Sequence, residues 1–171
     1  MIRMTWYVRQ QHTETFTRIG GRSYVIAAEE GFCPGGNARI VDVTDEAHPV
    51  SVSELTLGVN TLPGCLIAQA DRDAGQNLLL YMTHYISVDD PSDASLAFIS
   101  WYSAGLRVFD ISDPSHPVEV AYYNPAVGET SDRSHDSTTT YPRYVAETGQ
   151  VWVGSSVNAL SILSLDPALR P

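Results

Sequence analysis

Three histidines, His12, His84 and His135, are the side chains whose type and spacing point most directly to chemistry. They precede three similar β-rich segments, which begin at residues 38, 106 and 160, by 26, 22 and 25 residues. Imidazoles that converge from equivalent positions can bind a transition metal or an anion. The alternative is that each ring is a polar residue hydrogen-bonded to a neighbouring unit, and the unequal spacings favour this interpretation over a metal site.

The catalytic alternative is a hydrolase or lyase that uses His84, His135 and Asp89. It requires these side chains to come within roughly 3 Å of one another. Adjacent carboxylates occur at Glu29–Glu30 and Asp89–Asp90, but neighbours on a strand point to opposite faces. We therefore expect turn or rim positions for both pairs and assign no catalytic residue.

The composition excludes several classes of function. The net charge is −10, and the ten basic residues are scattered arginines, whereas nucleic-acid binding needs clustered basic side chains. The absence of lysine excludes Schiff-base chemistry and a P-loop. No apolar run approaches the roughly 20 residues that a membrane span requires. We expect no cofactor.

One pattern occurs twice without a gap. ARIVDVTDEAHPVS at 38–51 and LRVFDISDPSHPVE at 106–119 share six identical residues, and NALSILSLDP at 158–167 is a weaker third copy. Aspartates in such turn clusters are typical of side-chain caps, and a histidine that recurs at equivalent positions argues for a structural role. We assign structural roles to the repeated residues Arg39, Asp42, Asp45, His48, Arg107, Asp110, Asp113 and His116.

Short β-branched and aromatic runs, separated by turn residues, predict an all-β fold. Grouped by the repeat, they form units at approximately 12–57, 78–124 and 135–165. This grouping is typical of β-propeller blades, of which propellers usually have four to eight. We predict one incomplete propeller domain over residues 1–171, with about three four-stranded antiparallel blades. The first strand of a blade lines the axial channel, so His12, His84, His135 and Asp89 are candidates for its mouth.

Two cysteines, Cys33 and Cys65, lie in loop-like contexts. They are compatible with one disulfide in an oxidising compartment or with two free thiols, and the sequence leaves both open.

The segment GLRVFDISDPSHPVEVAYYNP resembles the LVIVD-repeat family, whose units carry a Gly-Leu-x-Val-x-Asp-Ile-Ser-Asp-Pro-x-x-Pro core. The resemblance covers most of residues 20–165. It implies a β-propeller, typically on exported or surface-associated bacterial proteins, and generally no established enzymatic activity.

Together these features predict a non-catalytic binding or scaffold module, extracellular or at the cell surface. We expect a protein or a surface glycan as its partner, and either self-association or further blades on a longer parent chain. The first residues lack an apolar segment, so no signal peptide is expected in this chain. The alternatives are the histidine–aspartate enzyme and a gene fragment with no independent function.

Overall fold

The computed structural model describes residues 11–74, 81–126 and 136–171, in which three antiparallel sheets account for most of the regular structure. The first sheet has the strand order β1-β2-β3-β4, the second β5-β6-β7-β8 and the third β9-β10-β11. The strands are β1 (Gln11–Ile19), β2 (Arg22–Glu29), β3 (Ala38–Asp42), β4 (Val50–Leu55), β5 (Tyr85–Val88), β6 (Leu96–Ser100), β7 (Leu106–Asp110), β8 (Val118–Tyr123), β9 (Arg143–Val145), β10 (Gln150–Ser155) and β11 (Ala159–Ser164).

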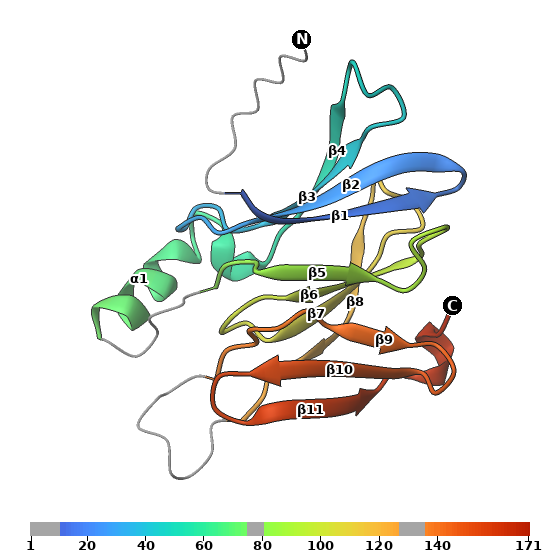
Figure 1. The fold of residues 1–171 in the computed structure, drawn as a ribbon. Coiled ribbons are helices and arrows are strands. Elements are labelled where there is room, and N and C mark those ends of the chain that lie inside the picture. The colour runs from blue at the N-terminus through green and yellow to red at the C-terminus, as the bar shows by residue number, and fades with distance from the viewer. Residues whose placement is uncertain (1–10, 75–80, 127–135) are drawn as a thin grey trace.

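Helix is nearly absent from the described residues. One α-helix, α1 (Cys65–Asp73), and two 3₁₀ turns, η1 (Gly58–Asn60) and η2 (Pro167–Leu169), lie outside the sheets. None of these helices is long and apolar enough to cross a membrane. Sheets of four, four and three strands confirm the predicted all-β class and are consistent with partial propeller blades (Figure 1).

The repeated pattern produces the same local structure in the first two sheets. The pairing of β3 with β4 has a bulge between Ile40 and Val41, and that of β7 with β8 has one between Val108 and Phe109. Each bulge lies 68 residues from its counterpart, which is the spacing of the two repeats. The repeat therefore specifies strand register as well as strand sequence.

The turn after each repeated strand is closed by its own side chains. Asp45 Oδ1 accepts a hydrogen bond from the Ala47 amide at 3.0 Å, and Asp113 Oδ1 accepts one from the Ser115 amide at 3.0 Å. The second carboxylate oxygen of each aspartate pairs with Nδ1 of the histidine three residues later, at 2.9 Å for His48 and 3.1 Å for His116. Asp42 and Asp110 cap the start of the same two turns. Each accepts a hydrogen bond from the amide two residues later, Asp42 from Thr44 and Asp110 from Ser112.

Two apolar cores lie between the sheets. Ile26 and Ile40 of the first sheet pack with Ile99, Trp101 and Phe109 of the second, and all five side chains are buried. The opposite face of the second sheet packs on the third, through Phe98 and Val108 against Val151, Val153 and Leu165. The second sheet is covered on both faces, and this explains why its strands carry apolar side chains on both faces.

The first strands of the sheets are joined by side-chain hydroxyls. Figure 1 shows β1 beside β5, and β5 beside β9. Thr13 Oγ donates to the carbonyl of His84 at 2.5 Å, and Thr15 Oγ donates to that of Ile86 at 2.7 Å. Ser87 Oγ donates a hydrogen bond to the carbonyl of Pro142 at 2.5 Å. These bonds satisfy carbonyls that no strand ladder reaches and so fix the inner ends of the sheets.

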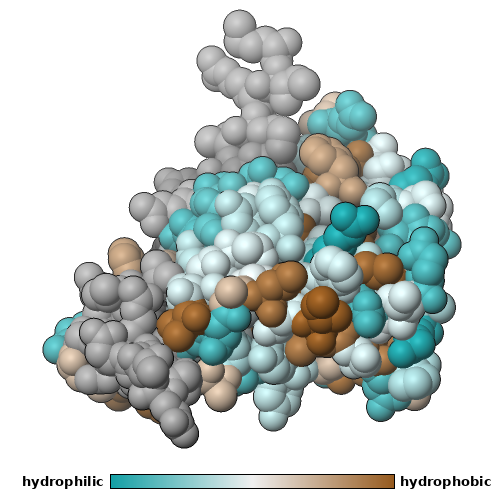
Figure 2. All heavy atoms as spheres, turned by 60° about the horizontal axis from the view of Figure 1, so that its bottom comes forward, coloured by the Kyte–Doolittle hydropathy of each residue, from teal (hydrophilic) through white to brown (hydrophobic). Residues whose placement is uncertain are grey.

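The outer face of the third sheet has no sheet packed on it among the described residues. It carries Trp152, Leu160 and Ile162, which are 38%, 57% and 53% exposed. Trp152 pairs directly with Ile162 across β10 and β11, so these two side chains share one face. Figure 2 turns this part of the molecule toward the reader and shows isolated apolar side chains among polar ones.

Asp136 is a buried carboxylate that anchors the segment before β9 to the turn between β10 and β11. It accepts hydrogen bonds from six groups: the amides of Ser137, Val157 and Asn158, the hydroxyls of Ser155 and Ser156, and the side-chain amide of Asn158. Burial alone would raise its pKa, but the hydrogen bonds from Ser155, Val157, Ser137 and Ser156 outweigh burial and hold the pKa below 3.8.

We expect Asp136→Asn to lower the free energy of unfolding by about 3 kcal/mol, because the new amide group faces donors where an acceptor stood. Since the folded pKa is below the unfolded one, the carboxylate stabilises the fold above pH 3.8, and this contribution is lost as the pH falls through the folded pKa. Urea denaturation at several pH values measures both effects. The variant Glu46→Gln makes the same charge change at an exposed carboxylate; it is the control and should change stability by less than about 0.5 kcal/mol. Equal losses in the two variants would contradict this role of Asp136.

Candidate functional site

The packing of the first sheet on the second brings His12 and His84 together. His12 lies near the start of β1 and His84 immediately precedes β5. Their rings stack with centroids 4.4 Å apart, and Nδ1 of His12 donates to the carbonyl of His84 at 3.1 Å. The third candidate histidine, His135, lies outside the described residues. Two of the three histidines considered from spacing are thus neighbours in space.

A β-bulge aims His12 at this position. Gln11 pairs with Glu29 and Thr13 pairs with Ala28, so His12 is the extra residue of β1 and has no partner on β2. Bulges turn a side chain away from the face that strict alternation would give it. His12 can therefore approach His84 although its neighbour Thr13 also bonds to His84.

Glu30 and Tyr102 complete a group that we call the histidine cluster: His12, Glu30, His84 and Tyr102. Glu30 Oε1 accepts hydrogen bonds from His84 Nδ1 at 2.5 Å and from the Tyr102 hydroxyl at 2.6 Å. His12 Nδ1 lies 3.8 Å from the same oxygen. The sequence analysis predicted a turn or rim position for Glu30. It could not predict the hydrogen bond with His84, because the two residues are 54 positions apart in the chain.

The protonation of the cluster follows from its burial. Burial lowers the pKa of His84 below 6.5, and the nearby His12 lowers it further, although the Glu30 carboxylate acts in the opposite direction. The His84 ring is therefore neutral near pH 7. Burial, followed by the hydrogen bond to Glu30, raises the pKa of the Tyr102 phenol, so it remains protonated.

Tyr102 holds its place with a backbone conformation that is unusual for a bulky residue. Its φ is +28°, and Thr138 pairs with it through an amide that donates to the Tyr102 carbonyl at 3.0 Å. Such conformations persist only where surrounding structure enforces them, and they concentrate at functional sites.

Asp89 is not part of the cluster. It follows β5, whereas His84 precedes it, so roughly 16 Å of extended chain separates the two residues. Its carboxylate accepts hydrogen bonds from the amides of Ser95 and Leu96 at 3.0 and 2.9 Å, and from the Ser95 hydroxyl at 2.7 Å. The structure therefore places Asp89 in the turn between β5 and β6.

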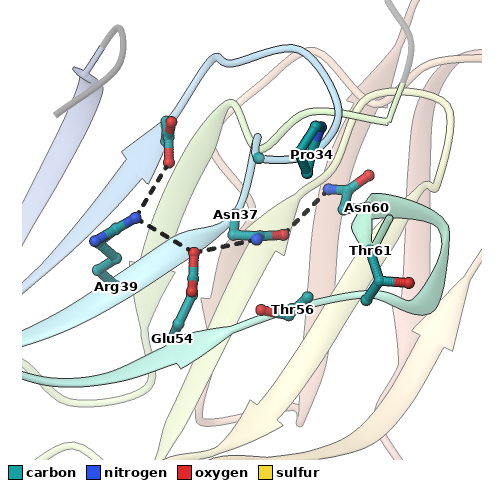
Figure 3. Close-up of a pocket in the computed structure, with 9 residues that line it drawn as sticks. Pro34, Asn37, Arg39, Glu54, Thr56, Asn60 and Thr61 are labelled. Carbon is teal, nitrogen blue, oxygen red and sulfur yellow. Dashed lines mark hydrogen bonds and ion pairs between the residues drawn. The ribbon is translucent and has the colours of Figure 1, made fainter. Parts of the chain in front are cut away.

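A polar pocket of about 430 Å³ opens on the other side of the first sheet (Figure 3). We call it the Arg39 pocket. It is lined by Glu29, Pro34, Gly35, Asn37, Arg39, Glu54, Thr56, Asn60 and Thr61. Glu29 and Glu30 are adjacent but face apart, so one carboxylate reaches this pocket and the other the histidine cluster.

The wall of the pocket is built by the loop between β2 and β3. A disulfide joins Cys33 in this loop to Cys65 at the start of α1, with the two Cα atoms 5.4 Å apart. Asn60 in η1 donates to the carbonyl of Gly36 at 3.2 Å and to Asn37 Oδ1 at 3.3 Å. Gly36 has a φ of +75°, and a Cβ there would lie 2.6 Å from the Gly31 carbonyl oxygen, so the loop requires glycine at this position.

The repeat shows what is unusual about Arg39, because each of the three guanidinium nitrogens of its counterpart Arg107 donates a hydrogen bond. Arg107 Nε donates to the Ala104 carbonyl at 2.8 Å and Nη1 to Glu119 at 2.8 Å. Nη2 donates to Asn124 at 3.3 Å, and the guanidinium lies 5.0 Å from the centre of the Tyr122 ring. Its side chain is only 15% exposed.

Arg39 lacks the equivalents of these hydrogen bonds and makes weaker contacts. Its side chain is 35% exposed, and Nη2 makes only two long contacts, 3.5 Å to Glu54 and 3.8 Å to Glu29. Nε is buried and has no hydrogen-bond partner. The reason is that the carbonyl of Gly36, the counterpart of Ala104, already accepts from the Thr83 amide and from Asn60.

The sequence carries a signal for this difference that a search for identities misses. The residues that pair with Arg107 are Glu119, Tyr122 and Asn124, and the positions 68 residues earlier hold Ser51, Glu54 and Thr56. An arginine that repeats while its partners change is a candidate for a role outside the scaffold.

We expect Arg107→Gln to lower the free energy of unfolding by about 2 kcal/mol, because hydrogen bonds to a largely buried charged group are lost. Arg39→Gln should leave stability within about 0.5 kcal/mol of the wild type, since it removes few good contacts. Thermal and urea denaturation of the two variants side by side test this difference. Equal destabilisation would show that Arg39 is as structural as Arg107.

The LVIVD-repeat model matches residues 95–125, which contain β6, β7 and β8. No curated protein matches the chain. The match confirms the resemblance seen in GLRVFDISDPSHPVEVAYYNP and agrees with the sheet architecture. The chain therefore carries an LVIVD repeat, a repeat type that forms β-propellers.

Proposed function

We propose that this chain is a non-catalytic binding module of the β-propeller type, and that it binds the hydroxyl-rich end of a surface glycan in the Arg39 pocket. The observation that carries the proposal is the incomplete pairing of Arg39 compared with Arg107, whose three guanidinium nitrogens all donate hydrogen bonds. A buried donor without an acceptor is costly, by about 1–3 kcal/mol, and such groups are found where a ligand or water completes the bonding.

The pocket offers both donors and acceptors to a ligand. Arg39 donates; Glu54 uses one oxygen for Asn37 and Arg39, which leaves its second oxygen to accept. Asn60 donates through its amide nitrogen to the loop, so its amide oxygen is also an acceptor. A sugar presents adjacent hydroxyls that both donate and accept, which suits this mixed set. The volume falls in the range of about 300–1,000 Å³ that is usual for small-ligand sites.

The charges in the pocket argue for a neutral ligand. Two carboxylates, Glu29 and Glu54, lie beside one guanidinium, so the local formal charge is −1. An anion would be repelled by both carboxylates, and the chain as a whole carries −10. A cation would have to approach Arg39.

The disulfide supports a location outside the cytoplasm. Disulfides persist in oxidising compartments and are rare where glutathione and thioredoxin keep thiols reduced. The Cys33–Cys65 bond holds the loop that forms the pocket wall, so the proposed site depends on it. We accordingly place the module in a secreted or surface-exposed setting.

The enzyme alternative is less well supported. It required His84, His135 and Asp89 to converge, and His84 and Asp89 lie at opposite ends of β5. The polar groups of the Arg39 pocket include no nucleophile paired with a base among the described contacts.

A glycan microarray with neutral, sialylated and sulfated glycans tests the proposal. We expect the labelled wild-type chain to bind a subset of neutral glycans and Arg39→Gln to lose at least 10-fold in affinity, which calorimetry with the best glycan quantifies. Arg22→Gln makes the same charge change on a surface arginine that pairs with Asp42, and should bind like the wild type. Absence of glycan binding, or equal binding by Arg39→Gln, would contradict the proposed function.

A second copy of the chain is the partner that the third sheet favours. The face of the first sheet that carries Ile26 is covered by the second sheet, and the face of the second sheet that carries Phe98 is covered by the third. The corresponding face of the third sheet, which carries Ile162, is exposed. Two copies supply six main sheets of the propeller type, within the four to eight that closed propellers use.

Light scattering of the purified chain measures this association. We expect a species of defined mass above the monomer's 18.7 kDa, and a monomer for the double variant Leu160→Ser, Ile162→Ser. Leu66→Ser removes an exposed leucine on α1 and should leave the mass unchanged. A wild-type chain that stays monomeric at high micromolar concentration would exclude pairing through this face.

A further inference from the structure

The histidine cluster contains three side chains of the types that bind transition metals. His12, Glu30 and His84 each offer one ligand atom, and these atoms all lie within 4.8 Å of one another. They come from β1, from the residue after β2 and from the residue before β5, so only the packing of two sheets unites them. None of the three side chains belongs to the repeated motif, and none lines the Arg39 pocket.

The ligand set selects the kind of metal. Calcium and magnesium prefer oxygen ligands, whereas imidazole nitrogens favour zinc and other late transition metals. Two histidines and one glutamate are the protein ligands of several open zinc sites, in which water takes the fourth position. We propose that His12, Glu30 and His84 form a zinc-binding site at the junction of the first and second sheets, with water completing the coordination.

The residue types in the cluster suit a cation. Zinc needs neutral imidazoles and a deprotonated carboxylate, so binding is favourable where these forms already exist. Glu30 Oε1 accepts hydrogen bonds from His84 Nδ1 and from the Tyr102 hydroxyl, so an acceptor oxygen already faces the histidine rings. No arginine side chain approaches the cluster in the described contacts, which involve only His12, His84, Tyr85, Tyr102 and Glu30.

The support for the ligands is already built. The bulge in β1 turns His12 toward His84, and Thr13 anchors β1 to the His84 carbonyl. The Tyr102 hydroxyl donates to Glu30 and orients its carboxylate, which is the role of an outer partner in metal sites. The Tyr102 ring stacks on the His84 ring with centroids 4.4 Å apart, which holds that hydroxyl beside Glu30.

The ligands must draw together when zinc binds. Zinc–nitrogen distances of about 2.0–2.1 Å put tetrahedral ligand atoms roughly 3.3 Å apart, closer than the 4.8 Å limit of the cluster. Nδ1 of His12 and Nδ1 of His84 now donate hydrogen bonds, so each ring must either shift its proton to Nε2 or turn to present Nε2. His12 is exposed and can make this adjustment, which leads us to expect micromolar rather than nanomolar affinity.

Calorimetric titration with zinc chloride tests the site. The chain should carry no histidine tag and be treated with EDTA and dialysed beforehand. We expect one zinc ion per chain with low-micromolar affinity, and at least a 10-fold loss in His12→Gln and in Glu30→Gln. These two variants are preferred to changes at His84, which is more deeply packed.

The turn histidines supply a matched control. The double variant His48→Gln, His116→Gln removes two imidazoles that each pair with an aspartate at the surface, and it should bind zinc like the wild type. Cobalt in place of zinc gives a second readout, because its visible spectrum reports nitrogen coordination. Zinc affinity that is weaker than micromolar, or that is unchanged in both His12→Gln and Glu30→Gln, would overturn the site. Arg39→Gln should bind zinc normally, so failure of this site and failure of the glycan pocket are distinguishable.

Discussion

The sheets of this chain depend on one another because the apolar side chains on their faces must be covered. Ile26 and Ile40 are buried by packing against Trp101 and Phe109, and Phe98 is buried by packing against Val151. The hydroxyls of Thr13 and Ser87 then hold the inner strands together where no ladder exists. In such repeat architectures stability resides in the interfaces between units as much as within them. The histidine cluster follows from this constraint, since His12, Glu30 and His84 meet only when the first and second sheets are packed together.

The two sites show two ways in which a repeat scaffold acquires chemistry. The histidine cluster lies at an interface, where a bulge at His12 departs from regular strand pairing. The Arg39 pocket lies within one unit, where a repeated arginine has lost the partners that Arg107 keeps. The turn residues Asp45 and Asp113, by contrast, make the same bonds in both units and carry no such difference.

The repeat, the strand pattern and the sheet architecture could be predicted because they depend on local alternation and turn chemistry. The proximity of His12 and His84 also followed in part from their places before the repeated strands. Glu30 and Tyr102 could not be found this way, because their contacts cross from one sheet to another. The role of Asp136 could not be predicted either, because five of its six donors belong to residues 155–158, about 20 positions further along the chain. Spacing measures position along the chain, whereas these roles depend on packing.

The most direct test of the account is to compare the hydrogen exchange of two arginine Nε–H groups by ¹⁵N NMR. The Nε–H of Arg107 is bonded to the Ala104 carbonyl in a side chain that is 15% exposed, so it should exchange slowly. The Nε–H of Arg39 has no partner and belongs to a side chain that is 35% exposed, so it should exchange much faster. Addition of a neutral glycan selected on the array should then slow the exchange at Arg39 alone. Equal protection of the two groups in the free chain would contradict the claim that the repeat leaves Arg39 free to bind.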